Sequence, residues 1–441
     1  MSTPTAQTGQ LNQPDSVSRR QIAVALGASV LGFSLDLFDY SVLLYVASTV
    51  GPLMFPADNP TLSLAGVYAA YGTSAVVRPL GAALFGNYAD RHGRKKALFI
   101  SVGGVGIITA LMGTVPPVSK IGALATVLFI ALRFLQGLFV GGVPASTHTL
   151  GTETVPPSWR GWVSGLIGAG GSGIAQLLSA GVFLIMSLIF PGPAFAVWGW
   201  RCMFFCGLFA SLLALFVLYN LNESPLFVAL QKKKSVVTKA PIRILFSKQY
   251  RGIALINIIT AFGAAAMFYV APGYLPTFLG VINHLPRSVI AKILLWGGVG
   301  AIILPQIAGI LSQVFGRKKA FFAIGMLGLA MFSYGYYTLA DAHSISKIAA
   351  YSLAMIWLGD VAIAPVMIFL NERFPTAIRA TGTAFCWNVG FALGGLVPLA
   401  VSLLSPRITD IPSRLTWFAL LASVCLILGP MLCEETKGRF E

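Results

Sequence analysis

The sequence predicts an all-α membrane protein in which twelve transmembrane helices form two six-helix bundles. Of its 441 residues, 56% are hydrophobic and only 10% are charged, and its mean hydropathy is +0.80. A soluble domain carries about 25% charged residues, so this chain has too few charges to cover a surface that faces water. Phrases that recur in both halves of the chain indicate that one bundle is a copy of the other.

Twelve apolar stretches are each long enough to cross a hydrocarbon core of about 30 Å. They comprise residues 21–49, 62–88, 97–116, 122–149, 160–190, 198–219, 252–280, 288–313, 320–340, 346–370, 380–404 and 413–433. A long polar stretch follows the sixth of them and predicts a linker between the bundles. The predicted units are a tail at 1–20, a bundle at 21–220, the linker at 221–251, a second bundle at 252–433 and a tail at 434–441.

The evidence for duplication is two phrases that occur twice. One phrase runs from Gly86 to Ala97 and recurs from Gly309 to Ala320, and both copies end in Gly-Arg-Lys-Lys-Ala. A second phrase begins at Glu153 and recurs at Glu372, with an arginine seven residues later in each copy, Arg160 and Arg379. Transporters are often built from such repeats, with the substrate site between the repeats near the bilayer midplane.

The formal net charge is +16, and the positions of Lys and Arg attribute this excess to membrane topology. When successive loops are placed on alternate sides, 21 of the 30 Lys and Arg residues fall on the side of the termini and 5 on the other side. Cytoplasmic loops carry such an excess. Both termini are therefore predicted to be cytoplasmic, and no nucleic-acid partner is expected.

The first copy of the repeated phrase, Gly-x-x-x-Asp-Arg-x-Gly-Arg-Lys-Lys from Gly86, resembles the signature loop of the major facilitator superfamily. The ending Glu435-Thr-Lys-Gly438 is similar to that of its sugar porters, and Asp36-x-x-Asp39 resembles a pair in aromatic-acid carriers. The resemblance implies the major facilitator fold and proton-coupled transport by alternating access. Other phrases are similar to the metabolite:proton symporter branch, namely Arg133-Phe-Leu-Gln-Gly137, Trp198-Gly-Trp-Arg201 and Glu372-Arg-Phe-Pro-Thr376.

Two positions depart from the family pattern. Gln313 stands where the second copy of the signature would carry an acid, and Val143 stands where the branch usually carries a glutamate. The roles of those acids cannot be carried over to this chain. Span 7 also lacks the paired glutamines with which sugar porters recognise hydroxyl groups, which favours a substrate other than a sugar.

The charges of the repeated phrases are candidates for gating. The resemblance implies that Asp90, Arg91 and Arg94 form a latch that holds the cytoplasmic helix ends together in one state and releases them in the other. Further candidates at the other inner helix ends are Glu153 with Arg160, Arg317, and Glu372 with Arg379. The alternative is that these charges only set the topology, because a surface ion pair contributes about 0–1 kcal/mol.

Three acids lie deep within spans, namely Asp36, Asp39 and Asp360, although a charge at the bilayer centre costs about 2.5–3.5 kcal/mol. Asp39 lies about 15 Å from the outer end of span 1, and Arg133 lies at about the same depth in span 4. They form a candidate buried ion pair, and the resemblance implies that they couple transport to protons. Asp36 shares a helix face with Asp39 and is an alternative proton carrier. A structural pair that only fixes helix packing also stays open.

Candidate substrate contacts are polar or aromatic residues within spans. Arg78 lies about 18 Å from the inner end of span 2, where it could attract an anionic substrate or pair with a carbonyl or acid beside Pro79. Asp360 is either a second protonatable group or a counter-ion to Arg78. With Arg133, the remaining candidates are Tyr71, Gln176, Tyr269, Trp357 and Asn388, although aromatic residues in such helices often serve only in packing or at the membrane interface.

The sequence shows no phosphate-binding glycine loop, His/Cys cluster or nucleophile elbow, so it predicts neither an enzyme nor an ATP-driven pump, and no metal or cofactor. It predicts a lipid-embedded, monomeric carrier in a bacterial inner membrane that takes up a small organic acid with protons. A zwitterionic osmolyte or a sugar is the alternative cargo. A membrane sensor on a transporter scaffold is the alternative of another class.

Overall fold

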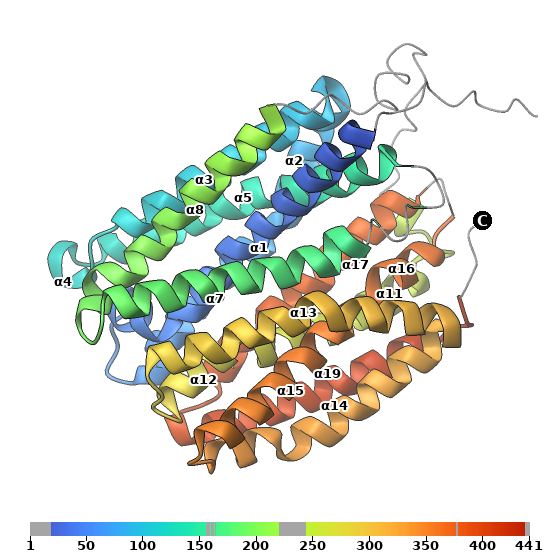
Figure 1. The fold of residues 1–441 in the computed structure, drawn as a ribbon. Helices are drawn as coiled ribbons and strands as arrows, with labels where there is room; N and C mark the ends of the chain where they lie inside the picture. Colours follow the sequence, from blue (N-terminus) through green and yellow to red (C-terminus); the bar gives the residue numbers. More distant parts are fainter. Residues whose placement is uncertain are drawn as a thin grey trace, which may run out of the picture.

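A computed structural model describes residues 19–155, 159, 163, 165–219, 244–375 and 378–436. These residues form helices joined by short turns, without strands, in two bundles that lie side by side (Figure 1). Both ends of the described chain lie at one end of the molecule, which we call the terminal face, and the opposite end is the far face. The predicted all-α membrane fold is confirmed.

The first bundle contains six spans, and two of them consist of more than one described helical segment. Its segments are α1 (Arg19–Met54), α2 (Pro60–His92), α3 (Arg94–Thr114), α4 (Val118–Ile121), α5 (Leu124–Glu153), the π-helix η2 (Leu166–Gly170), α7 (Gly171–Ile189), the π-helix η3 (Phe195–Gly199) and α8 (Trp200–Tyr219). The predicted linker and both predicted tails fall largely outside the described residues, so the unit boundaries stay predictions.

The second bundle repeats this order with more interruptions. Its segments are α11 (Arg251–Phe268), the π-helix η4 (Tyr269–Gly273), α12 (Leu275–Val281), α13 (Arg287–Phe315), α14 (Arg317–Ala340), α15 (Ile345–Ile363), α16 (Val366–Glu372), α17 (Arg379–Gly395), α18 (Val397–Leu403), the 3-10 turn η5 (Ile408–Asp410) and α19 (Ile411–Met431). The predicted spans 7, 10 and 11 are therefore each broken after a first segment of 17–19 residues, and a helical segment of 7 residues follows. Pro272, Pro365 and Pro398 lie at or next to these breaks. Proline has no N–H group to donate within the helix, which explains the interruptions.

Eleven of the described helical segments are long and apolar enough to cross a membrane. The predicted span 62–88 corresponds to α2, which at 33 residues is about 50 Å long but less apolar than the others. It packs against α5 of its own bundle and against α17 and α18 of the other bundle. A helix that meets protein on several sides needs fewer apolar residues than a helix that faces lipid.

The outer surface of the two bundles is apolar. Phe209, Phe216, Ile310 and Trp417 are among the exposed large side chains and are 64–73% exposed. Soluble monomers rarely expose apolar surface on this scale. These side chains are suited to contact lipid acyl chains, which agrees with a multi-pass membrane protein.

The repeated phrase has the same local structure in both bundles. Gly93 and Gly316 join the second and third spans of their bundles with φ angles of 107° and 101°, which a residue with a Cβ rarely adopts. Two residues later, Lys95 donates a hydrogen bond to the carbonyl of Tyr219 at 3.0 Å, and Lys318 donates one to the carbonyl of Cys433 at 2.8 Å. In each bundle this lysine therefore ties the third span to the end of the sixth, where a cation is favoured by the helix dipole.

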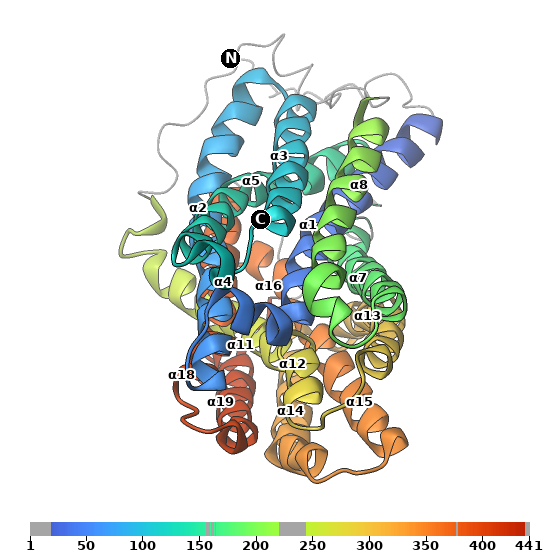
Figure 2. The ribbon, with the colours of Figure 1, turned by 90° about the vertical axis from the view of Figure 1, so that its left-hand side faces the viewer.

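The bundles meet through symmetry-related helices. The second span of each bundle packs on the fifth span of the other, α2 on α17 and α18, and α13 on α7 (Figures 1 and 2). Three hydrogen bonds also join the bundles toward the far face. They run between the Tyr68 and Thr277 hydroxyls (2.9 Å), from Asn59 to the Pro406 carbonyl (2.7 Å) and from Arg287 to the Gly192 carbonyl (3.2 Å).

Glycines let α7 and α13 approach each other closely. A Cβ at Gly173 would lie 2.5 Å from the backbone nitrogen of Ile302, and a Cβ at Gly298 would lie 2.7 Å from that of Leu177. Neither backbone can yield without moving a whole helix. This contact joins the two bundles and is suited to act as a pivot between them.

Replacing Gly298 by alanine is expected to push α7 and α13 apart and to destabilise the protein by about 1–3 kcal/mol, the usual cost of overpacking. Gly309 on the same helix is the matched control, because a Cβ there meets nothing within 4 Å. Gly309→Ala should be neutral or stabilising by up to about 1 kcal/mol. Denaturant unfolding of both variants in mixed micelles checks this, and equal stability of the two would contradict the proposed contact.

Candidate functional site

A group of buried polar side chains lies inside the first bundle, and we call it the charged cluster. It consists of Asp39 on α1, Thr109 on α3, and Arg133 and Gln136 on α5. Asp39, Arg133 and Gln136 are each no more than 3% exposed. Gln136 donates hydrogen bonds to a carboxylate oxygen of Asp39 and, at 2.9 Å, to the hydroxyl of Thr109. Its amide oxygen accepts a hydrogen bond from Arg133 at 2.5 Å.

The structure thus brings Asp39 and Arg133 together, as the sequence predicts, but it corrects the contact between them. The two side chains are close enough for their charges to interact, yet the hydrogen bonds between them pass through Gln136 and not through a direct ion pair. Gln136 was not among the residues that the sequence indicated. Its spacing could have identified it, because Gln136 lies three residues after Arg133 and shares its helix face.

Several polar atoms at this place are left without a hydrogen-bond partner among the described residues. They are the second carboxylate oxygen of Asp39, the Nε and one terminal nitrogen of Arg133, and the hydroxyl of Tyr71. A buried polar group without a partner costs about 1–3 kcal/mol. The set includes donors and an acceptor, so a small polar molecule with a carboxylate group could satisfy it.

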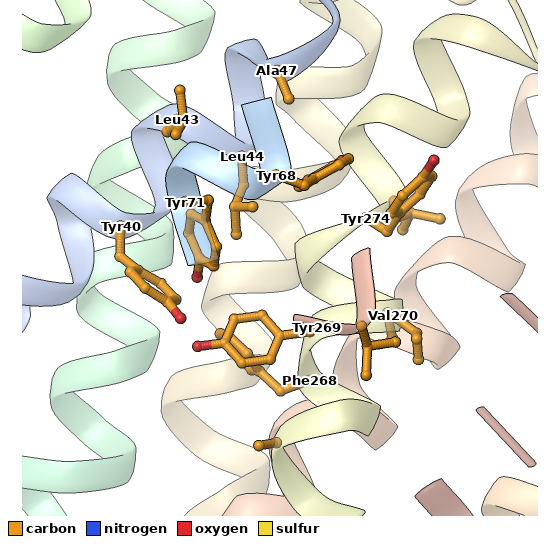
Figure 3. Close-up of a cluster of buried hydrophobic side chains, with 14 of the residues drawn as sticks. Tyr40, Leu43, Leu44, Ala47, Tyr68, Tyr71, Phe268, Tyr269, Val270 and Tyr274 are labelled. Carbon is orange, nitrogen blue, oxygen red and sulfur yellow. The ribbon is translucent and has the colours of Figure 1, made fainter. Parts of the chain in front are cut away.

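Three tyrosines form a second group, the tyrosine cluster, where the bundles meet (Figure 3). Tyr40 of α1 and Tyr71 of α2 have ring centroids 4.3 Å apart, and Tyr269 of η4 lies 5.7 Å and 5.8 Å from them. Figure 3 shows the three hydroxyl groups pointing toward one another. The predicted candidates Tyr71 and Tyr269 therefore lie together, and Tyr40 is an additional member that sequence analysis missed.

Arg78 lies between the two clusters. Its guanidinium group stands over the ring of Tyr40, 4.5 Å from the centroid, and its charge acts on both Asp39 and Arg133. A cation over an aromatic face is stabilised by the ring quadrupole. Arg78 is thus a deep cation beside the candidate site, as the sequence predicts.

The structure gives Asp360 a different partner from the predicted one. The Gln176 amide donates a hydrogen bond of 2.7 Å to a carboxylate oxygen of Asp360, so the expectation that Asp360 is a counter-ion to Arg78 is wrong. Gln176 lies on α7 of the first bundle and Asp360 on α15 of the second. The Gln176 amide thus joins the two bundles, and the predicted contact of Gln176 with a substrate stays a prediction.

Two other predicted substrate contacts are engaged by the protein itself. The Trp357 indole donates to the Gly297 carbonyl at 3.2 Å and packs where a Cβ on Gly300 would collide with it. The Asn388 amide donates to the Ala384 carbonyl of its own helix at 2.9 Å. Both side chains are only partly buried, so their contact with a substrate stays a prediction.

At the terminal face of the second bundle, Arg317 and Glu372 form a buried ion pair. The Nε of Arg317 donates to one oxygen of Glu372 at 3.2 Å and a terminal nitrogen donates to the other at 3.0 Å. The same guanidinium group also donates to Gln313 and, at 2.7 Å, to Ser312. Arg317 is a partner of Glu372 that the sequence did not indicate. The predicted pairing of Glu372 with Arg379 stays a prediction, because the side chain of Arg379 lies outside what the structure describes.

The end of the chain joins this ion pair. The Glu435 carboxylate accepts hydrogen bonds from the backbone N–H groups of Arg317 and Lys318 at 2.9 and 3.1 Å. The Thr436 hydroxyl donates to Glu372 at 2.8 Å. A carboxylate at the first turn of α14 satisfies N–H groups that have no partner within the helix. Four segments are therefore held at one point by side chains from α13, α14, α16 and residues 435–436.

Some predicted residues lie outside what the structure describes. Arg160 is among the residues that are not described, and so are the side chains of Asp36, Asp90, Arg91, Arg94, Glu153 and Arg379. Their predicted roles in proton coupling and gating stay predictions. Within the described residues, no three His, Cys, Asp or Glu side chains are grouped in a way that could hold a metal ion.

Comparisons with known proteins agree with this architecture. A sequence profile of the Major Facilitator Superfamily matches residues 22–385. The chain is 31% identical over 385 residues to the inner membrane metabolite transport protein YhjE of Escherichia coli K12, over 86% of each chain. It is 26% identical over 422 residues to the glycine betaine/proline/ectoine/pipecolic acid transporter OusA of Dickeya dadantii, over 94% of this chain and 84% of the other.

A solved structure supports the same arrangement of helices. The crystal structure of a D-xylose-proton symporter aligns with a TM-score of 0.74, over 96% of this chain and 100% of the other. The two sequences are 18% identical. A likeness at this level of identity shows the fold alone.

Replacing Gln136 by leucine is expected to lower the free energy of unfolding by about 2 kcal/mol or more, because Asp39 and Arg133 each lose a buried hydrogen bond. The loss should be smaller in an Asp39→Asn background, with a coupling energy of about 1 kcal/mol or more. Unfolding of the two single variants and the double variant in mixed micelles measures this coupling.

The control for this cycle is Asn283→Ala, which removes a hydrogen bond to the Leu339 carbonyl at the far face of the second bundle. Its effect should add to that of Asp39→Asn within about 0.5 kcal/mol. Equal coupling in both cycles would show that Gln136 does not bridge the charged cluster.

Replacing Glu372 by glutamine is expected to destabilise the protein by about 3–5 kcal/mol, because the guanidinium group of Arg317 would remain buried without its counter-ion. Gln313 already contacts that group, so the double variant Gln313→Glu/Glu372→Gln should recover part of the loss. Thermal unfolding in detergent compares the variants. If the double variant is no more stable than Glu372→Gln, the carboxylate does not act through Arg317.

Proposed function

The chain belongs to the major facilitator superfamily, and we propose that it carries a small organic acid into the cell together with one or more protons. It is a multi-pass membrane transporter and not an enzyme. The observation that carries the proposal is the placement of the charged cluster beside Arg78 and the tyrosine cluster. A buried acid, two arginines and three tyrosines thus surround one place at mid-depth.

The arginines favour an anionic cargo. Two nitrogens of Arg133 have no hydrogen-bond partner among the described residues, and an arginine offers a planar fork that matches a carboxylate. The Tyr71 hydroxyl, which also has no partner there, can donate to the same group. Tyr269 from the other bundle would complete the site, so that a bound acid touches both bundles.

Asp39 is suited to carry the proton. Burial favours the neutral form of a carboxyl group, and a nearby guanidinium favours the ionised form. When helix movement or a bound anion draws Arg133 away, the balance shifts and Asp39 takes up a proton. One monoanion and one proton would then cross together without net charge. This avoids the work of about 2.3 kcal/mol per elementary charge and 100 mV of membrane potential.

The distribution of charge assigns the orientation of the protein in the membrane. The side with most Lys and Arg residues is the terminal face, which we assign to the cytoplasm of a bacterium by the positive-inside rule. A relative that is named an inner membrane protein supports this assignment. The bundles are joined at the far face, which would be outside, so the state described here has its site closed to the exterior. We expect the carrier to act as a monomer surrounded by lipid.

A zwitterion is the second candidate cargo, and one observation favours it. Arg78 lies over the ring of Tyr40, so a tyrosine face in this site already accepts a cation. A substrate ammonium group could bind there in the same way, while its carboxylate binds Arg133. The name of OusA includes such zwitterions. Nothing in the described residues favours a sugar or a non-transporting sensor.

The test is uptake by the purified protein in proteoliposomes against a panel of monocarboxylates, dicarboxylates, betaines and sugars under an imposed pH gradient. We expect accumulation of one or more carboxylates, abolished by an uncoupler. Accumulation of a betaine but of no simple acid would select the second candidate. Accumulation that survives the uncoupler would exclude proton coupling.

Replacing Asp39 by asparagine is expected to abolish proton-driven accumulation and to spare counterflow exchange, because exchange needs no net release of a proton. Asp341→Asn is the matched control, since Asp341 is an exposed acid at the end of α14. It should leave both activities unchanged. If Asp39→Asn still accumulates the acid against a gradient, another group carries the proton.

A further inference from the structure

A second buried carboxyl group lies outside the charged cluster. Asp360 and Gln176 are each 4% exposed, and their hydrogen bond crosses from one bundle to the other. The second oxygen of Asp360 has no hydrogen-bond partner among the described residues. This carboxyl group therefore has one oxygen committed to the contact between the bundles and one oxygen available to a proton.

A pocket of about 260 Å³ opens between the bundles on the side of the far face. Its walls come from α1, α7, α12 and α13 and the turn before α13, and the polar side chains that line it are Tyr45, Ser48, Thr49 and Arg287. A pocket with several polar groups can hold water. Tyr45 is also close enough to Asp360 for the charges of the two groups to interact. Tyr45 thus lines this pocket and is also near the buried carboxyl group.

The other ionisable groups on the helices that pack around Asp360 either contact other parts of the protein, or are exposed or lie at or near helix ends. The helices that pack against α15 are α11, α13, α14, α16 and the turn η4. Tyr336 of α14 donates its hydroxyl to the Val270 carbonyl, and Tyr269 of η4 belongs to the tyrosine cluster. The charged residues of the remaining elements are the exposed Lys292 and, at or near helix ends, Arg251, Arg287, Arg317, Lys318, Lys319 and Glu372. α7 carries no ionisable side chain.

We propose that Asp360 is a second proton-binding site, reached from the far face through the pocket beside Tyr45, whose protonation weakens the hydrogen bond that Gln176 makes between the two bundles. The proposal deepens the proposed proton-coupled transport and rests on it. The proton binds the oxygen of Asp360 that faces no partner, and the oxygen that accepts from Gln176 loses its negative charge.

The effect of that proton follows from the strength of the hydrogen bond. A hydrogen bond to an ionised carboxylate is about twice as strong as one between neutral groups. The charged cluster differs in this respect, because Asp39, Thr109, Arg133 and Gln136 all belong to the first bundle. A proton on Asp39 changes the substrate site, whereas a proton on Asp360 changes the contact between the bundles. The two sites would therefore serve different steps of one cycle.

The first test needs only protons. Infrared spectra of the full chain in proteoliposomes, recorded during a pH titration, show the C=O band of each protonated carboxyl group. We expect one such band to vanish in Asp360→Asn and to shift in Asp360→Glu, while a different band vanishes in Asp39→Asn. Wild-type bands that persist unchanged in both Asp360 variants would overturn the proposal. If the wild type shows the band assigned to Asp360 but no band assigned to Asp39, Asp39 is not the proton carrier, whereas Asp360 is still supported as a proton-binding site.

The second test measures the contact between the bundles. Ser48→Cys places a thiol in the pocket, and a membrane-impermeant maleimide measures its access from the far face. The parent chain with its five native cysteines is the background control. We expect alkylation to be about fivefold faster at low pH than at high pH, the difference between a charge-assisted and a neutral hydrogen bond. Because maleimide reacts with the thiolate, each rate is first divided by the rate of a free thiol at the same pH, and the fivefold difference refers to these normalised rates.

Three further variants decide what the pH dependence means. Asp360→Asn should make alkylation fast at every pH, and Gln176→Leu should do the same while keeping the Asp360 infrared band. Tyr45→Phe should slow the loading of Asp360 after a pH jump on the far side without changing its final extent. Asp341→Asn is the matched control and should behave like the parent. Alkylation that keeps its full pH dependence in Asp360→Asn would rule out Asp360 as the group that controls the contact.

Discussion

The constraint on which this structure depends is that polar groups inside a bilayer must find partners within the protein, because the hydrocarbon core has no water to offer. The chain meets it in part with glutamine amides, and several of the atoms that still have no partner among the described residues lie at the proposed substrate and proton sites. Gln136 accepts from Arg133 and donates to Asp39, and Gln176 donates to Asp360. An amide carries no charge, so it stabilises a carboxylate without neutralising it. A direct arginine partner would hold the acid ionised more firmly. An amide-bonded acid at mid-depth remains able to gain and lose a proton.

Duplication explains where these groups can be placed. The repeated glycines Gly93 and Gly316 turn the chain in the same way in both bundles, and the following lysines bind the ends of the sixth spans. With the helix ends held, the second span of each bundle can pack on the fifth span of the other. The bundles differ where the repeats diverge. Gln313 replaces an acid in the second copy of the phrase, and Glu372 supplies the missing carboxylate to Arg317 from the neighbouring span.

The sequence predicted the positions of the spans and the proximity of Asp39 and Arg133, because hydropathy and depth along a helix are properties of single helices. It could not predict partners that depend on how helices rotate about their axes and on how the two bundles are set together. The contacts of Glu372 with Arg317 and of Asp360 with Gln176 are of this kind. Tyr269 points toward Tyr40 and Tyr71 from a π-turn, a local irregularity that often occurs at functional sites and that an apolar span does not reveal. Helix spacing alone could have predicted that Gln136 lies beside Arg133.

The location of the two acids has a consequence for coupling. A proton-coupled carrier of the kind proposed above must prevent its bundles from moving when only one of proton and substrate is bound, since that movement would dissipate the gradient. An acid whose hydrogen bonds stay within one bundle can report whether the substrate site is filled, but it has no direct hold on the other bundle. Asp360 does contact the other bundle, through its hydrogen bond with Gln176. Among the described hydrogen bonds, none joins Asp360 to Arg133 or to the tyrosine cluster. A ligand that contacts Arg133 of the first bundle and Tyr269 of the second would provide the missing link, because both bundles would bind it at once. In the proposed cycle, coupling would then depend on three contacts, and the substrate would supply the middle one.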